Sequence, residues 1–194
     1  MQRREALRIL GQLAVLPAFS RLPLDRLDGL GREIHQRLGD QPALRLLDPH
    51  QHELVAVAAE LIVPETDTPG ARAARVADFI DLIVAEWYTP EEQKRFLDGL
   101  ADLDRRSQSR LGRVFLDAGP ADRERTLSEL EAEWLAFRVS AAKPEEHFYH
   151  QIKYLTIYGY YTSKVGVEQE LHWSPVPGRY DPCLATGVRR KESR

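Results

Sequence analysis

The chain has 194 residues, a length that suits one domain with its own hydrophobic core. Hydrophobic residues make up 43% and charged residues 29%, a composition that is typical of globular proteins and excludes a wholly disordered chain. The 27 Lys and Arg nearly balance the 30 Asp and Glu, so a dedicated nucleic-acid binder is not expected, and the single Cys excludes a metal site built from several cysteines of this chain.

The first 20 residues have the order of charge and hydrophobicity of an export signal. Arg3 and Arg4 precede a mostly apolar stretch from Ile9 to Phe19. An adjacent arginine pair in this place is typical of a twin-arginine (Tat) signal. We therefore predict a Tat-like signal over residues 1–20, with Arg3 and Arg4 as its signal residues. An ordinary amphipathic N-terminal helix is the alternative.

Residues 21–46 predict a linker that contains a marginal helix. Several leucines fall near helical spacing, whereas Gly29, Gly31 and Gly39 weaken the helix. The linker is expected to be mobile or to lie on a partner.

Residues 47–183 predict a single all-α domain of about five or six helices. Asp48-Pro49 and Thr89-Pro90 are typical helix starts, and Pro64 ends the first helix. Further helices are expected from Val76 to Trp87, from about Ala121 to Arg138, and from Lys143-Pro144 onward. In the helix that ends near Arg138 the predicted inward residues are Leu127, Leu130, Trp134 and Leu135. The only plausible strand is a short piece around Gln169–Trp173.

The chain changes character after Gly159. The prolines between Pro175 and Pro182 preclude a helix and predict an extended segment rich in proline and aromatic residues, followed by a frayed tail at 184–194. Aromatic side chains in such a segment either pack on their own core or anchor a partner. We predict a partner interface that contains Tyr160, Tyr161, Trp173, Tyr180 and Cys183. In the alternative, Tyr160 and Tyr161 pack the last helix onto the bundle. Cys183, as a single Cys, is either a free thiol or half of an intermolecular disulfide with a partner.

His147 and His150 have a spacing, i and i+3 on one helix, that suits a metal ion. A carboxylate-bridged site would need a matching Glu-x-x-His pattern on a second helix, and the sequence has none. A helix face with two partly buried histidines is the simpler interpretation. Because no nucleophile, dinucleotide or phosphate motif is found either, we predict no catalytic, cofactor or metal site in this chain. An independent helical metal-binding protein or enzyme that uses His147 and His150 is the alternative.

Two segments carry a resemblance to a known family. The first runs from Ile62 to Ala71 and on to Leu82, and the second joins Leu155–Gly166 to Pro175–Asp181. The strings Gly-Tyr-Tyr-Thr-Ser at 159–163 and Pro-Gly-Arg-Tyr-Asp at 177–181 are unusual, and Trp87 to Glu92 between the segments also fits. Over roughly residues 47–183 the chain resembles the gluconate 2-dehydrogenase subunit 3 family.

The resemblance implies a small, non-catalytic subunit of a periplasmic, membrane-associated sugar or sugar-acid dehydrogenase. It implies a large partner subunit, a flavoprotein of the glucose–methanol–choline type that holds the FAD, and a multihaem cytochrome c as a possible third subunit. It also implies that the small subunit assists folding, Tat export and assembly of the flavoprotein. The chain itself is then expected to hold no cofactor, to bind no nucleic acid and to reach the membrane through the complex.

Overall fold

The structure, a computed structural model, describes residues 43–140 and 143–173. Within these ranges the chain forms five α-helices with short 3-10 and π-helical segments and no strand, which confirms the all-α prediction. Several sequence predictions lie outside the described residues: the Tat-like signal with Arg3 and Arg4, most of the linker, the extended segment with Tyr180 and Cys183, and the tail.

The α-helices are α3 (Pro49–Ile62), α4 (Val76–Trp87), α5 (Pro90–Leu111), α6 (Pro120–Ser140) and α7 (Phe148–Thr162). The short segments are the 3-10 helices η2 (Phe115–Asp117) and η3 (Pro144–Glu146) and the π-helix η4 (Gly166–Glu170). The starts of α3 and α5 follow the predicted capping pattern. The side chains of Asp48 and Thr89 each accept a hydrogen bond from the backbone N–H three residues later, and a proline follows each cap.

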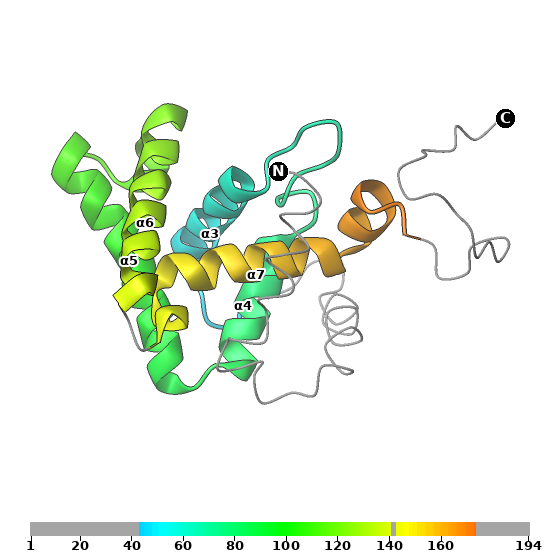
Figure 1. Ribbon diagram of the computed structural model, residues 1–194, viewed down its shortest axis with the longest axis horizontal. Helices are drawn as coiled ribbons and strands as arrows, with labels where there is room; N and C mark the ends of the chain where they lie inside the picture. The colour runs from blue at the N-terminus through cyan, green and yellow to red at the C-terminus, as the bar shows by residue number, and fades with distance from the viewer. Residues whose placement is uncertain (1–42, 141–142, 174–194) are drawn as a thin grey trace, which may run out of the picture.

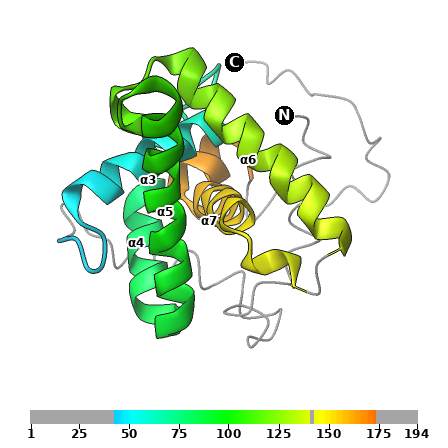
Figure 2. The same ribbon diagram turned by 90° about the vertical axis from the view of Figure 1, so that its left-hand side faces the viewer.

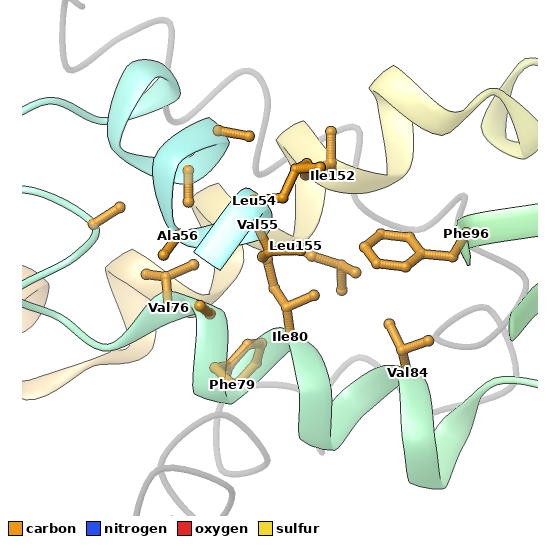
Figure 3. Packing of buried hydrophobic residues seen from close by; sticks show 14 of the residues in the cluster. Leu54, Val55, Ala56, Val76, Phe79, Ile80, Val84, Phe96, Ile152 and Leu155 are labelled. Atoms are coloured by element: carbon orange, nitrogen blue, oxygen red, sulfur yellow. The ribbon is translucent and has the colours of Figure 1, made fainter. Parts of the chain in front are cut away.

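Helix α7 is the centre of the bundle, because it contacts each of the other four α-helices. Figure 2 looks nearly along α7 and shows α5 and α6 on different sides of it. Figure 3 shows how the core is filled: Leu54 and Val55 of α3, Ile80 of α4 and Leu155 of α7 point toward one another, and Phe96 closes the group from α5. These side chains are at most 1% exposed. Burial of such side chains is the main source of stability in a domain of this size.

The last long helix differs from the prediction at both ends. Residues 144–146 form the separate helix η3, and α7 begins only at Phe148 because the His147 Nδ1 accepts the backbone N–H of Tyr149 at 3.2 Å. At its other end α7 continues through Gly159 to Thr162. A Cβ at residue 159 would lie 2.8 Å from Cδ1 of Phe79, so glycine is what permits α7 to pack closely on α4.

The strand considered at Gln169–Trp173 is wrong. Residues 166–170 form η4 instead, and the backbone N–H of Leu171 donates to the carbonyl oxygen of Gly166 at 2.9 Å. The turn into η4 needs glycine, because a Cβ on Gly166 would lie 2.1 Å from the carbonyl oxygen of Tyr160. The side chain of Ser163 bridges the same two residues: its hydroxyl donates to the Tyr160 carbonyl at 2.6 Å and accepts from the Gly166 N–H at 3.0 Å.

Candidate functional site

The two segments that carry the family resemblance meet at one end of the bundle. Figure 1 shows the loop between α3 and α4 beside the C-terminal end of α7 and η4. Two hydrogen bonds join them. The hydroxyl of Tyr160 donates to the carbonyl oxygen of Pro69 at 2.8 Å, and the hydroxyl of Thr68 donates to the carboxylate of Glu170 at 2.8 Å. Residues that are 91 and 102 positions apart in the sequence are therefore held together.

The loop between α3 and α4 is braced by a carboxylate of α3. One oxygen of Glu60 accepts the backbone N–H of Glu65 and the other accepts that of Arg72, both at 2.8 Å. The carboxylate fits under the loop because residue 70 is glycine: a Cβ there would lie 2.2 Å from Glu60 Oε1 and 2.6 Å from the Glu65 nitrogen. Hydrogen bonds from two backbone N–H groups to one ionised carboxylate belong to the stronger class in proteins.

An open pocket of about 300 Å³ lies between the loop and the end of α7. Its walls are the loop residues on one side and Tyr160, Tyr161 and Glu170 on the other. The two tyrosine rings meet edge to face, with centroids 5.2 Å apart. Two carboxylates, those of Asp67 and Glu170, line the pocket, and the resembling segments contribute the loop residues, Tyr160 and Tyr161.

The predicted interface residues occupy different environments. Tyr160 is only 2% exposed and is part of the core of its own chain, which is the alternative that the sequence left open. Tyr161 is half-buried at the pocket, and Trp173 is 48% exposed. Tyr180 and Cys183 lie outside the described residues. An interface through Tyr161 and Trp173 thus stays a prediction, and Tyr160 supports that surface from beneath.

A buried carboxylate on α4 was not among the residues predicted from the sequence. Asp81 is 3% exposed and accepts the backbone N–H groups of Arg45, Leu46 and Leu47 at 2.7, 3.0 and 2.8 Å. The end of the predicted linker is therefore fixed to the domain, and the packed chain begins slightly before residue 47. An Asp in the middle of the apolar run Phe79–Val84 was the available signal, since a buried carboxylate needs hydrogen-bond donors.

His147 and His150 do not converge on a common point. The Nδ1 of His147 is used to cap α7, and the ring of His150 stacks on Trp134 of α6 with centroids 5.4 Å apart. Burial lowers the pKa of both imidazoles, which favours their neutral form. No group of three potential metal-ligating side chains occurs at residues 43–140 and 143–173. In the same residues no helix combines the length and hydrophobicity required to cross a bilayer.

The comparison with known protein families identifies the family of the chain. The model of the family described as gluconate 2-dehydrogenase subunit 3 matches residues 49–178. No curated protein and no solved structure matches the chain. The matched range contains the five α-helices of the described part of the chain, the braced loop and the pocket. Since the match spans well over half of the sequence, the chain belongs to the gluconate 2-dehydrogenase subunit 3 family.

Proposed function

We propose that this chain is the non-catalytic small subunit of a periplasmic, FAD-dependent sugar or sugar-acid dehydrogenase. In this proposal the FAD belongs to a large flavoprotein subunit of the glucose–methanol–choline type, and a multihaem cytochrome c is a possible third subunit. The observation that carries the proposal is the family match over residues 49–178, because the family name describes one subunit of an oxidoreductase complex.

The roles of the resembling residues support an accessory subunit. Gly70, Gly159 and Gly166 each make room for an atom that a Cβ would meet within 3 Å. Glu60 braces a loop, and Tyr160 joins α7 to that loop. Gly70, Gly159, Gly166 and Tyr160 lie in the segments that carry the resemblance, and here they shape the packing of α7 on α4 and on the loop, as expected if a defined surface is what the subunit supplies to its partners.

We propose that this chain contacts the flavoprotein through the end of the bundle where the pocket lies, beside the C-terminal end of α7. Tyr161 on the pocket wall and Trp173 at the end of the described chain are large amphipathic side chains, the kind that dominates binding hot spots. Tyr180 and Cys183 belong to the same predicted interface in the sequence that follows. Assistance with folding and Tat export, through Arg3 and Arg4, completes the proposal.

The test is reconstitution with the other subunits of the same complex. The purified full-length chain alone is expected to show no flavin absorption and no sugar oxidation, and the co-expressed complex is expected to show both, with the chain present in stoichiometric amount. A flavin that stays bound to the isolated chain through gel filtration would refute the non-catalytic role. A flavoprotein that purifies without this chain at full yield, activity and export would refute the accessory role.

The export part needs its own measurement. Replacing Arg3 and Arg4 together by lysine is expected to leave both this chain and the flavoprotein in the cytoplasmic fraction. Unchanged periplasmic activity of the double variant would contradict the export role and leave the subunit assignment in place.

A further inference from the structure

Another pocket lies beside the one described above, between α3, α6 and α7. Its volume is about 190 Å³, and Ile62 at the end of α3 lines both pockets. This volume is smaller than the roughly 300–1,000 Å³ of pockets that bind drug-sized molecules. The pocket therefore has room for several water molecules or for one small organic molecule.

The pocket lies along the half of α6 that packs on the bundle. Leu127 and Leu130 in this half are at most 5% exposed. Leu135, nearer the C-terminal end of α6, was predicted to point inward, which is wrong, because it is 43% exposed. Glu124 and Ser128 are about one turn apart, and both are exposed and line the pocket. These two side chains can therefore contact a molecule that enters from the solvent.

Helix α7 contributes a lysine to the pocket. Lys153 is the only Lys, Arg, Asp or Glu of α7, and its Nζ forms an ion pair with Glu131 Oε1 at 2.6 Å. The same Nζ lies 5.5 Å from the centroid of the Tyr149 ring. An ammonium group has three N–H donors, and Glu131 accepts one of them, so two remain for a molecule in the pocket.

Tyr149 adds a hydroxyl group that stays protonated. Its ring lines the pocket, and the residue is 4% exposed. Burial raises the pKa of the Tyr149 hydroxyl, and the negative charge of Glu131 raises this pKa further. The polar side of the pocket thus combines an ammonium, two carboxylates and neutral hydroxyl groups.

This combination of charges favours a neutral ligand. The carboxylates of Glu124 and Glu131 line the pocket together with the ammonium of Lys153. Glu131 is paired with Lys153, whereas Glu124 forms no ion pair within the described residues. In so small a pocket an anion would lie close to two carboxylates, and a cation would lie close to the ammonium. A hydroxyl group avoids both conflicts, because it can donate to a carboxylate and accept from an ammonium.

The rest of the pocket wall is apolar. Leu61 and Ile62 of α3 and Leu127 of α6 form it. An apolar wall with a few placed polar groups is the usual composition of a small-molecule site, in which the polar groups fix the orientation of the ligand. A sugar ring matches this division, because its hydroxyl groups project from the edge and its C–H groups form an apolar face.

We propose that this pocket binds a neutral, hydroxyl-rich molecule no larger than a monosaccharide. The proposal goes beyond the proposed function, which assigns no ligand site to this chain. It is also independent of that function, because every group that forms the pocket comes from this chain. In a sugar dehydrogenase complex, the site would let the small subunit bind a sugar at a place that belongs to its own fold.

The experiment uses the purified full-length chain and three sugars that share one ring. D-Glucose is neutral, D-glucosamine carries an ammonium, and D-glucuronate carries a carboxylate. The methyl resonances of Leu61, Ile62 and Leu127 report on the pocket in NMR spectra. We expect glucose to shift them in a saturable manner by about 100 mM, a concentration that nearly fills a site with a Kd of about 1 mM. Both charged sugars should bind more weakly than glucose.

Two variants place the binding in this pocket. Ser128→Leu puts a larger side chain on the pocket wall, and Ser109→Leu makes the same change at an exposed position of α5 as the control. Lys153→Met keeps an unbranched side chain and removes the ammonium donors. We expect Ser128→Leu and Lys153→Met to weaken glucose binding at least about tenfold, and Ser109→Leu to change it less than about threefold. Because residue 128 is exposed, the melting temperature of Ser128→Leu should stay within a few degrees of the wild type.

Three outcomes would overturn the proposal. The first is that glucose at about 100 mM causes no shift of the pocket methyl groups, which would leave a pocket that holds water only. The second is that the shifts persist unchanged in Ser128→Leu, which would place the binding elsewhere on the chain. The third is that glucosamine or glucuronate binds at least as tightly as glucose. None of these outcomes affects the proposed function, because the flavoprotein takes no part in the experiment.

Discussion

Replacing Asp81 by alanine should detach the segment before α3 from the domain. The carboxylate accepts three backbone N–H groups, those of residues 45, 46 and 47, and it is 3% exposed. A hydrogen bond to a charged group contributes about 1.5–3 kcal/mol, but the three bonds share one acceptor group and are not additive. After the substitution water can reach the N–H of Arg45, which is at the surface, whereas the N–H of Leu47 is left buried without an acceptor.

We therefore expect Asp81→Ala to lower the free energy of unfolding by about 3–4 kcal/mol. Asp81→Asn keeps one acceptor oxygen but turns an NH₂ group toward backbone donors, so we expect it to lower the free energy of unfolding by about 2 kcal/mol. Asp98→Asn is the matched control. Asp98 forms an exposed ion pair with Lys94 at i, i+4, and removing this ion pair should lower the free energy of unfolding by no more than about 0.5 kcal/mol.

Urea denaturation of the full-length chain measures all three values, provided that the dependence on urea concentration stays the same. Amide hydrogen exchange adds a local measurement, since the Leu47 amide should exchange much faster in Asp81→Ala while amides in the middle of α7 follow global unfolding. A free energy of unfolding of Asp81→Ala within about 1 kcal/mol of the wild type, the order of one ordinary hydrogen bond, would contradict this anchoring role of Asp81, and so would unchanged protection of the Leu47 amide.

Three further predictions concern single side chains. Gly159→Ala should lower the free energy of unfolding by about 1–3 kcal/mol, because the new Cβ would lie 2.8 Å from the Phe79 ring. Gly119→Ala is the control and should have little effect, because the atom nearest to its Cβ would be 3.9 Å away. Equal effects of the two substitutions in urea denaturation would argue against the close packing of α7 on α4. Burial lowers the pKa of His150 in the folded chain, so the unfolded chain binds a proton at this histidine more readily. The free energy of unfolding should therefore fall as the pH drops below about 6.5. His150→Gln should make this decrease in the free energy of unfolding smaller. If the pH dependence of unfolding does not change in the variant, His150 does not cause the decrease. Trp173→Ala should weaken binding to the flavoprotein while the isolated chain loses less than about 1 kcal/mol; a large drop in its melting temperature would instead assign Trp173 to the core.

The features that the sequence predicted well are local. A capping box needs only the cap residue and the residue three positions later, so the starts of α3 and α5 could be read directly from Asp48-Pro49 and Thr89-Pro90. The helix ending before Pro64 is equally local, because proline restricts the residue before it. The family resemblance was also a property of short strings, and the family match over residues 49–178 confirms it.

The features that could not be predicted from the sequence depend on contacts between residues far apart in the chain. Tyr160 was predicted at an interface because an aromatic residue near a proline-rich segment suits one, but its position is decided by Pro69, 91 residues away. Asp81 could not be placed from the sequence because its partners are backbone N–H groups at residues 45–47, where the predicted linker meets the predicted domain, more than 30 positions away. Leu135 was placed inward because helical periodicity does not distinguish between two opposite apolar faces, and only the position of α6 on the bundle shows which one is covered.

The central position of α7 has a consequence for synthesis of the chain. Among the α-helices at residues 43–140 and 143–173, the ribosome makes α3 first and α7 last, yet α7 contacts each of the other four. Leu54 and Val55 find their partner Leu155 only after about 100 more residues have been added. Contacts of such long sequence separation slow folding, because a large loop must close before they form. The apolar surface that α7 covers on the other helices therefore stays exposed until α7 has been made, whereas contacts such as those between α3 and α4 can form earlier.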